Sequence, residues 1–242
     1  MKVKGEYPIV QAFKGLNVIV NQAVFIFNQD GLTVTAVDPA NVSMVQIRAE
    51  PQSFDVYTVD EEVKIGLDVD KIFNFLKIAK RKDVIEMEYD KEKNLFKLKV
   101  GNIEYQIAII SPEAIKVPKY PDLEFTVRAT IDAGEFKKVI QYISKIKAEE
   151  AVFRSDETGL YIEANTEIDR LVFSAGELEM IEFNKGKGKG VYSIEYLKDL
   201  VKVAERGDTV TIQFGDDIPL SLTYNVGEKV YIKYLLAPRI QV

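Results

Sequence analysis

The feature that most constrains this chain is an internal repeat at a domain-sized spacing. Residues 76–83 (LKIAKRKD) return as residues 201–208 (VKVAERGD), with four identities in eight positions and an offset of 125. Two flanking pairs return in the same order, Phe13-Lys14 as Phe136-Lys137 and Gly31-Leu32 as Gly159-Leu160. A module of about 120 residues is the size of a domain. The repeat predicts two tandem copies of one module; the alternative is chance similarity between two amphipathic helices.

Composition excludes several classes of chemistry. The 242 residues contain neither cysteine nor histidine, which excludes disulfides, thiol or Ser-His-Asp catalysis, and thiolate or imidazole metal sites. No carboxylate pair lies in a recognisable catalytic motif, so we expect no enzyme and no cofactor; a magnesium enzyme that uses carboxylates is a third-ranked alternative. The chain has no membrane-length apolar run and no signal-peptide core, so we expect an intracellular protein of the cytoplasm or nucleoid.

A Lys-Gly repeat occupies residues 185–190. It lacks the spacing and the Lys-Ser/Thr ending of a phosphate-binding loop. We interpret it as a flexible basic hairpin loop, and its role stays open.

Hydrophobic periodicity alternates between the periods of strands and helices. It predicts four hairpins, at 23–37, 84–100, 151–164 and 210–224, and four helices, at 9–21, 69–80, 135–147 and 194–204. Ser193 is the expected N-cap of the last helix. Each half then has two helices and an antiparallel sheet, so the predicted fold class is α+β with two similar domains.

A proline-containing segment separates the two halves. Three of the eight prolines lie within 111–124, which predicts an extended connector whose apolar side chains Ile115, Val117 and Leu123 are partly buried. We therefore expect domains at 1–110 and 126–242, joined by a connector at 111–125.

Charge is segregated along this acidic chain. Four windows around the predicted helices (9–24, 67–83, 134–148 and 193–208) hold 13 basic and 8 acidic residues, a net charge of +5. The remainder carries −11, for a total of −6. Lys198, Lys202 and Arg206 stand at helical spacing on one expected face, and the first helix presents Gln11 and Lys14. Basic faces of this kind favour weak, sequence-independent attraction to a duplex backbone, although solvated helix faces are the simpler alternative.

Three segments resemble the proliferating cell nuclear antigen family of DNA sliding clamps, in its archaeal form. They are Asp30–Val45, Ile115–Pro118 and Leu236–Ile240, in the family's order and spacing. With the repeat, the resemblance covers essentially the whole chain.

The resemblance implies that the two domains have the DNA clamp fold and that three chains close into a ring around duplex DNA. Such a ring is a polymerase processivity factor in DNA replication and DNA repair and catalyses no reaction. Its implied partners are DNA polymerase, flap endonuclease, ligase and a clamp loader, which bind through short peptide motifs. The alternatives are a clamp-fold protein–protein scaffold and one subunit of a heterotrimer.

The resemblance also implies three sets of site residues. The residues expected to face DNA are Lys14, Lys77, Lys80, Arg81, Lys137, Lys138, Lys145, Lys198, Lys202 and Arg206. The expected partner-peptide pocket comprises Val37, Val42, Met44, Ile115, Val117, Pro118, Leu235, Ala237 and Pro238. The expected subunit interface comprises Tyr105, Ile107, Ile109, Arg170, Val172 and Ser174.

Overall fold

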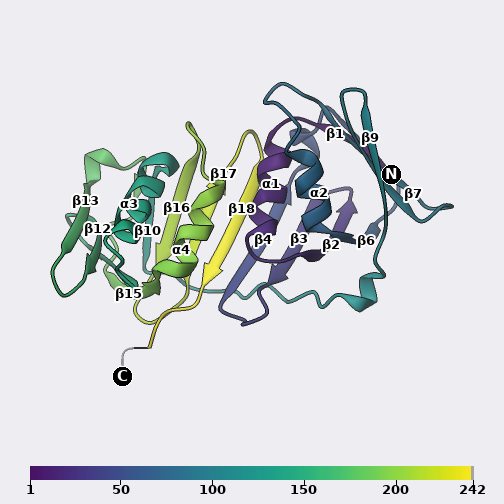
Figure 1. Ribbon diagram of the computed structural model, residues 1–242. Coiled ribbons are helices and arrows are strands. Elements are labelled where there is room, and N and C mark those ends of the chain that lie inside the picture. The colour runs from purple at the N-terminus through teal and green to yellow at the C-terminus, as the bar shows by residue number, and fades with distance from the viewer. Residues whose placement is uncertain (241–242) are drawn as a thin grey trace. The chain divides into compact units, whose positions relative to one another are not determined.

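The computed structural model describes residues 1–240, and the chain divides into two compact units (Figure 1). The first comprises Met1–Tyr120 with Asn225–Ile232, and the second comprises Pro121–Tyr224 with the chain from Lys233 on. Sequence reasoning had placed 225–232 in the second domain. These residues group with the first unit because Lys229 pairs with Glu50 at 3.2 Å and Gly227 lies against Pro8.

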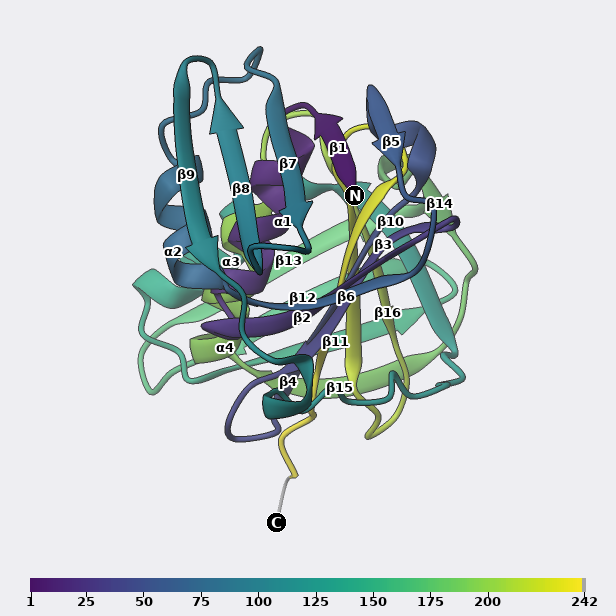
Figure 2. The same ribbon diagram turned by 90° about the vertical axis from the view of Figure 1, so that its right-hand side faces the viewer.

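The first unit contains two helices and two sets of antiparallel strands. Its elements are β1 (Lys2–Gly5), α1 (Pro8–Asn17), β2 (Gln22–Asn28), β3 (Gly31–Val37), β4 (Ser43–Ala49), β5 (Val56–Thr58), β6 (Val63–Asp68), α2 (Val69–Leu76), β7 (Ile85–Asp90), β8 (Leu95–Val100) and β9 (Ile103–Ala108). One set has the order β5-β1-β7-β8-β9, with β9 at its outer edge (Figure 2), and the other has the order β4-β3-β2-β6. Short 3-10 turns lie at Pro51–Ser53 and Pro112–Ala114.

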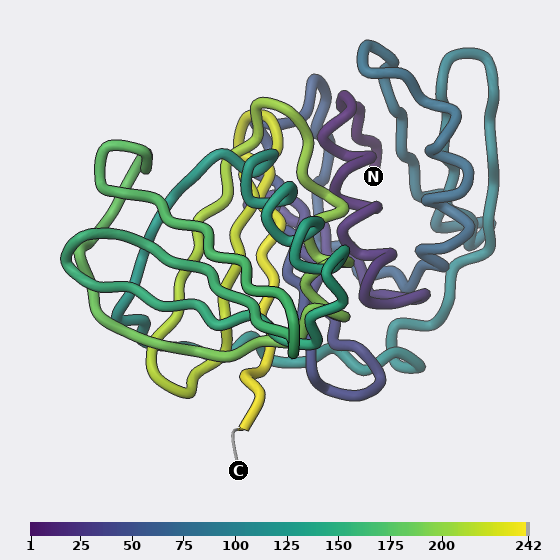
Figure 3. The backbone as a smooth tube through the Cα atoms, turned by 60° about the vertical axis from the view of Figure 1, so that its left-hand side comes forward, coloured from purple at the N-terminus to yellow at the C-terminus, as the bar shows by residue number. Residues whose placement is uncertain are grey.

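The second unit repeats this plan. Its elements are β10 (Val127–Asp132), α3 (Ala133–Lys145), β11 (Glu150–Asp156), β12 (Gly159–Asn165), β13 (Arg170–Gly176), β14 (Glu182–Phe183), β15 (Gly188–Ser193), α4 (Ile194–Leu200), β16 (Thr209–Phe214) and β17 (Leu220–Asn225), with 3-10 turns at Glu177–Glu179 and Val201–Val203. One set of strands has the order β13-β12-β11-β15 and the other β14-β10-β16-β17. Figure 3 shows the green hairpins of residues 150–176 from the side. Strand β18 (Val230–Leu236) is divided between the two units.

Each unit has its own core beneath its helices. Helix α2 buries Val69, Ile72 and Leu76, and α3 buries Phe136, Ile140 and Ile143, the apolar stripes that the sequence predicts. Asp68 and Asp132 cap these two helices by accepting hydrogen bonds from the Lys71 and Glu135 amides, at 2.9 and 2.8 Å. The predicted α+β class with two helices in each half is therefore confirmed. None of the helices within residues 1–240 is long and apolar enough to span a membrane.

The two copies share hydrogen bonds as well as sequence. The Asp83 carboxylate accepts from the Lys80 amide at 2.8 Å, and the Asp208 carboxylate accepts from the Glu205 amide at the same distance, 125 residues later. A Cβ at Gly31 would lie 2.1 Å from the carbonyl oxygen of Ala49, and a Cβ at Gly159 would lie 2.3 Å from that of Ala175. Chance similarity would not reproduce these contacts, so the repeat reflects one duplicated module.

Two local expectations were wrong. Helices α1, α2, α3 and α4 end at Asn17, Leu76, Lys145 and Leu200, before the predicted ends at residues 21, 80, 147 and 204. Ser193 stands at the N-cap of α4 as predicted, although its side chain makes no capping hydrogen bond. Residues 188–190 of the Lys-Gly repeat belong to strand β15 and are not loop.

We predict that Gly31→Ala lowers the free energy of unfolding by about 2–4 kcal/mol, because it adds a steric clash to an unfavourable backbone conformation. Gly31 has φ = 118°, and its Cβ would meet the Ala49 carbonyl. Gly101→Ala is the matched control: Gly101 also has positive φ, 58°, but its Cβ would meet nothing within 4 Å, so about 1–2 kcal/mol is expected. Chemical denaturation measures both, and equal losses would contradict the steric account.

Candidate nucleic-acid and partner interfaces

The basic residues of the first unit lie mainly in the turn that follows α2. Lys77, Lys80 and Arg81 are exposed, but α2 ends at Leu76, so the expected helical face does not exist beyond that residue. The Lys77 ammonium contacts the Asn74 side-chain oxygen at 2.7 Å and lies 4.9 Å from the centre of the Phe73 ring. The carboxylate of Asp83 closes the turn and fixes its backbone.

The second unit carries the equivalent turn. Lys198 lies on α4, Lys202 in the 3-10 turn, and Arg206 beyond both, with all three side chains exposed. Lys202 pairs with Asp199 at 2.6 Å. The predicted single stripe along one helix was therefore wrong, because Ala204 has extended backbone angles and Asp208 redirects the chain. Lys202 and Arg206 still correspond to Lys77 and Arg81 at an offset of 125.

Helix α3 presents only part of its predicted basic face. Lys138 and Lys145 are exposed, and Lys145 lies 4.8 Å from the ring centre of Tyr142, which is 58% exposed. Lys137 does not face solvent freely, because its ammonium donates a hydrogen bond at 2.7 Å to the carbonyl of Ala204. This contact ties α3 to the end of the 3-10 turn, so Lys137 has a structural role.

Helix α1 is the least charged of the four. Gln11, expected on the polar face, is only 5% exposed, and Lys14 is half-buried. The Asn17 amide donates to the Asp70 carboxylate of α2, which joins the two helices. The first unit therefore offers its positive charge through the turn after α2.

The first-unit residues of the expected peptide pocket flank the loop between β3 and β4. Val37 pairs with Met44 across the two strands, and both side chains are half-buried, as is that of Val42. The Asp38 carboxylate accepts from the Val42 and Ser43 amides at 2.8 Å each. This fixed loop holds three partly exposed apolar side chains, so these residues are not plain core.

The connector contacts the first unit through Ile115. Ile115 places its terminal methyl group 2.9 Å from the position that a Cβ would take at Gly66, and it is half-buried, like Pro118. Val117, expected to be partly buried, is 45% exposed.

The second-unit residues of the expected pocket differ in accessibility. Leu235 is only 5% exposed because it belongs to the core of that unit, whereas Ala237 and Pro238 are half-buried. The Arg239 amide donates to the Val191 carbonyl at 2.8 Å, which fixes the last described residues beside β15. A cavity of about 740 Å³ opens there. Its lining includes Lys189, Asp216 and Arg239, which sequence reasoning had not singled out.

Glycines in the Lys-Gly repeat permit close backbone packing. A Cβ at Gly186 would lie 1.9 Å from the Thr126 carbonyl oxygen. Lys185 and Lys187 point outward and pair with Glu177 and Glu157, each at 2.7 Å. The repeat therefore places lysine and glycine on opposite sides of the backbone.

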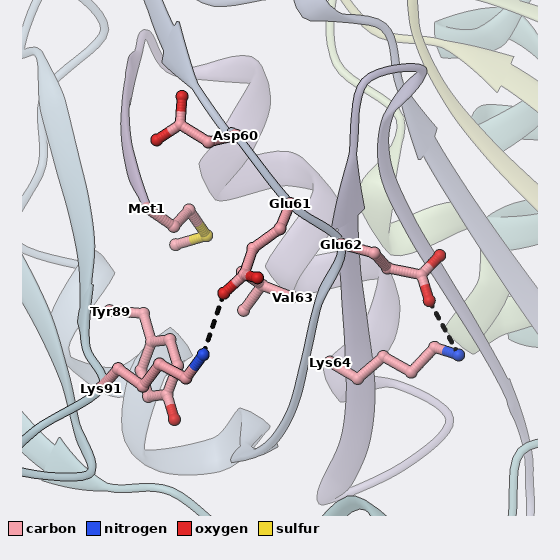
Figure 4. A pocket seen from close by; sticks show the side chains of 8 residues that line it. All are labelled: Met1, Asp60, Glu61, Glu62, Val63, Lys64, Tyr89 and Lys91. Carbon is pink, nitrogen blue, oxygen red and sulfur yellow. Dashed lines mark hydrogen bonds and ion pairs between the residues drawn. The ribbon is translucent and has the colours of Figure 1, made fainter.

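A charged cavity of about 640 Å³ lies on the first unit (Figure 4). Glu61 and Lys91 face each other across it at 2.9 Å, and the hydrogen bond from Lys91 lowers the pKa of the Glu61 carboxyl. Glu62 pairs with Lys64, also at 2.9 Å. Among residues 1–240, no group of three or more acidic side chains could hold a metal ion.

Five of the six expected interface residues lie on edge strands. β9 pairs only with β8 in its sheet order and β13 only with β12. Arg170 and Ser174 are exposed and Val172 is 49% exposed, whereas Ile107 is buried in its own unit. Ile109 lies just beyond β9. β9 and β13 thus each have a backbone edge without a neighbouring strand in their sheet, and β13 also exposes the side chains of Arg170, Val172 and Ser174.

Comparison with known proteins places this arrangement in one family. The model of the proliferating cell nuclear antigen N-terminal domain matches residues 8–111, and that of the C-terminal domain matches residues 119–239. A "DNA polymerase sliding clamp" of Archaeoglobus fulgidus is 44% identical over 225 residues, which cover 92% of this chain and 91% of the relative.

Solved structures agree with the family models. Archaeoglobus fulgidus PCNA, solved with the C-terminal region of FEN-1 bound, is 40% identical, with a TM-score of 0.95 over 100% of this chain and 99% of that chain. One chain of the PCNA2–PCNA3 complex of Sulfolobus tokodaii is 27% identical, with a TM-score of 0.88 over 99% of both chains. The chain therefore belongs to the proliferating cell nuclear antigen family.

Proposed function

We propose that this chain is a subunit of a DNA sliding clamp, a ring that encircles duplex DNA and confers processivity on DNA polymerase. The naming of its relatives as DNA polymerase sliding clamps supports this. The clamp acts by tethering enzymes and not by catalysing a reaction. Residues 1–110 and 126–242 are the proposed clamp domains, and 111–125 is the connector between them.

The observation that carries the proposal is the placement of positive charge. Lys77 and Arg81 of the first copy correspond to Lys202 and Arg206 of the second, in turns closed by the same aspartate hydrogen bond. Lys80, Lys138 and Lys198 have no carboxylate within 4.0 Å of their ammonium groups among the described residues. In a closed ring these positions recur at regular intervals. Lysine and arginine so arranged attract phosphates without reading bases, as sliding requires.

Partner enzymes bind, in this proposal, through a short peptide that enters an apolar groove. The relative bound to the C-terminal region of FEN-1 supports a peptide site in this family. The proposed lining is the predicted set, of which Val37, Val42, Met44 and Val117 offer accessible apolar surface, whereas Leu235 is buried. Polymerase, flap endonuclease, ligase and the clamp loader are the expected classes of partner.

Ring closure, in this proposal, joins the β9 edge of one subunit to the β13 edge of the next. A homotrimer is the simplest such ring. A heteromeric ring is the second candidate, because the solved relative from Sulfolobus tokodaii is a complex of PCNA2 with PCNA3.

We predict that replacing Lys77, Lys80, Lys202 and Arg206 with alanine reduces stimulation of a cognate polymerase about 5–10-fold at moderate salt, because four phosphate contacts are lost. The measurement is primer extension on a primed circular template across a salt series, with stimulation recovering at low salt. The matched control replaces Lys93, Lys99, Lys185 and Lys187, which removes equal charge from outside the helix pairs. Equal loss in both variants would contradict a local DNA contact.

We predict that Met44→Glu with Val117→Glu abolishes binding of a partner peptide, because a carboxylate in an apolar groove loses its hydration. Fluorescence anisotropy with a labelled C-terminal flap-endonuclease peptide measures affinity. Ile181→Glu is the control, since Ile181 is also exposed, at 67%, but lies outside the groove. Unchanged affinity in the double variant would remove both residues from the site.

A further inference from the structure

Helix α3 is longer than its counterpart in the first unit (Figure 1). It has thirteen residues, whereas α1 has ten. The repeat aligns Phe136 of α3 with Phe13 of α1, so Asn17, the last residue of α1, corresponds to Ile140. Residues 141–145 therefore form a helical turn that is an addition to the plan that the two copies share.

The added turn exposes an aromatic ring. Tyr142 is 58% exposed, whereas Ile19, its counterpart in the first unit, is only 9% exposed. The Tyr142 hydroxyl makes no hydrogen bond to any of residues 1–240. An exposed tyrosine ring offers a large, rigid contact area at little loss of conformational entropy, so Tyr142 is a candidate binding surface.

Two lysines accompany the ring. Lys138 precedes Tyr142 by four residues and Lys145 follows it by three, so the three side chains lie on one face of α3. The Lys145 ammonium lies 4.8 Å from the ring centre, which is a cation–π contact. Within residues 1–240, neither lysine has a carboxylate within 4.0 Å of its ammonium group. Their positive charge is therefore available to an anionic ligand.

The first unit has different residues at these three positions. At the same offset, Lys138 corresponds to Gly15 and Lys145 to Gln22, in addition to Ile19 for Tyr142. The first unit reaches the same plan with glycine, isoleucine and glutamine there, so folding does not require two lysines and an exposed tyrosine. The arrangement on α3 therefore points to a ligand.

Attraction to phosphates alone does not explain the ring. Lysines suffice to attract a duplex backbone, and the proposed sliding contact uses them in that way. Paired bases stack on their neighbours, so an aromatic ring reaches their faces only by parting the duplex, at an energetic cost. An unpaired base has a free face, and single-strand binding combines basic groups with aromatic side chains on which such bases stack.

We propose that Tyr142, Lys138 and Lys145 form a binding site for single-stranded DNA. An unpaired base stacks on Tyr142, and the two lysines bind the phosphates on either side of it. The site is independent of sequence, because every base has a π-face. It goes beyond the proposed function, since a ring that slides on duplex DNA needs no contact with an unpaired base. Within such a ring, the site would hold the template strand where the duplex of a primer ends.

Binding of a short labelled oligothymidine to the full chain tests the site, with fluorescence anisotropy at low salt as the measurement. Tyr142→Ala should weaken binding at least about fivefold, because a stacking contact is lost. Tyr142→Phe keeps the ring and should bind like the wild type. Leu178→Ala, which removes a fully exposed side chain from the same unit, is the control and should leave affinity unchanged. Equal affinity of Tyr142→Ala and the wild type, or no measurable binding by the wild type, would overturn the proposal.

An abasic oligonucleotide of the same length separates stacking from phosphate attraction, because it keeps the phosphates and lacks the bases. The wild type should bind it at least about fivefold more weakly than oligothymidine, whereas Tyr142→Ala should bind the two strands alike. Equal binding of both strands by the wild type would reduce the contact to phosphate attraction and overturn the stacking site.

Salt dependence tests the two lysines. Replacing Lys138 and Lys145 with glutamine should lower the slope of log affinity against log salt by about 1.4, because each lost phosphate contact on a single strand contributes about 0.7. Tyr142→Ala changes no charge and should leave the slope unchanged. An unaltered slope in the double-lysine variant would overturn the assignment of these lysines to the phosphates.

Retention on circular duplex DNA distinguishes this site from the proposed function. Tyr142→Ala should be retained like the wild type, because encirclement requires no stacking. Failure of oligothymidine binding, with retention intact, overturns the single-strand site and leaves the clamp function standing. Oligothymidine binding by a wild-type chain that is not retained on the circle overturns the clamp function alone.

Discussion

The backbone groups left open along β9 and β13 are the constraint on which the rest of this account depends. β9 and β13 end their sheets with six and seven residues, whereas the edge strands β5 and β14 have three and two. In the proposed ring, a head-to-tail contact between β9 and β13 converts a duplicated module into a repeating assembly. In the proposed ring the basic turns of successive copies surround a common space, so the DNA-binding proposal depends on this edge pairing.

The distribution of positive charge is the second feature on which the proposed function depends. A chain with net charge −6 keeps positive side chains in and around its helix pairs, and the turns at 77–83 and 202–208 hold them with the same aspartate hydrogen bond. Weak and sequence-independent attraction suits a ring that must move along DNA. The two copies differ in their exposed positive charge. On α1, Gln11 is buried and Lys14 is half-buried, whereas on α3 both Lys138 and Lys145 are exposed. Duplex contact should therefore be stronger at the second unit's helices.

Hydrophobic periodicity and the repeat were sufficient to predict the duplicated α+β plan, the four hairpins and the four helices, because those depend on local pattern. The turns that follow α2 and α4 are closed by local hydrogen bonds of Asp83 and Asp208, which together form one of the four identities of the repeat. The other failures depended on contacts distant in sequence. Lys137 occupies an outward helical position in sequence, and only the fold brings the Ala204 carbonyl to it. Burial of Leu235 likewise follows from tertiary packing.

The most direct test of the central claim is topological. The assembly is placed by a clamp loader on a nicked circular plasmid, washed at high salt, and its retention is measured before and after a single cut linearises the DNA. A ring that encircles the duplex is retained on the circle, because high salt screens phosphate contacts but cannot open a closed assembly, and it slides off the linear molecule. Equal retention on circular and linear DNA would contradict encirclement.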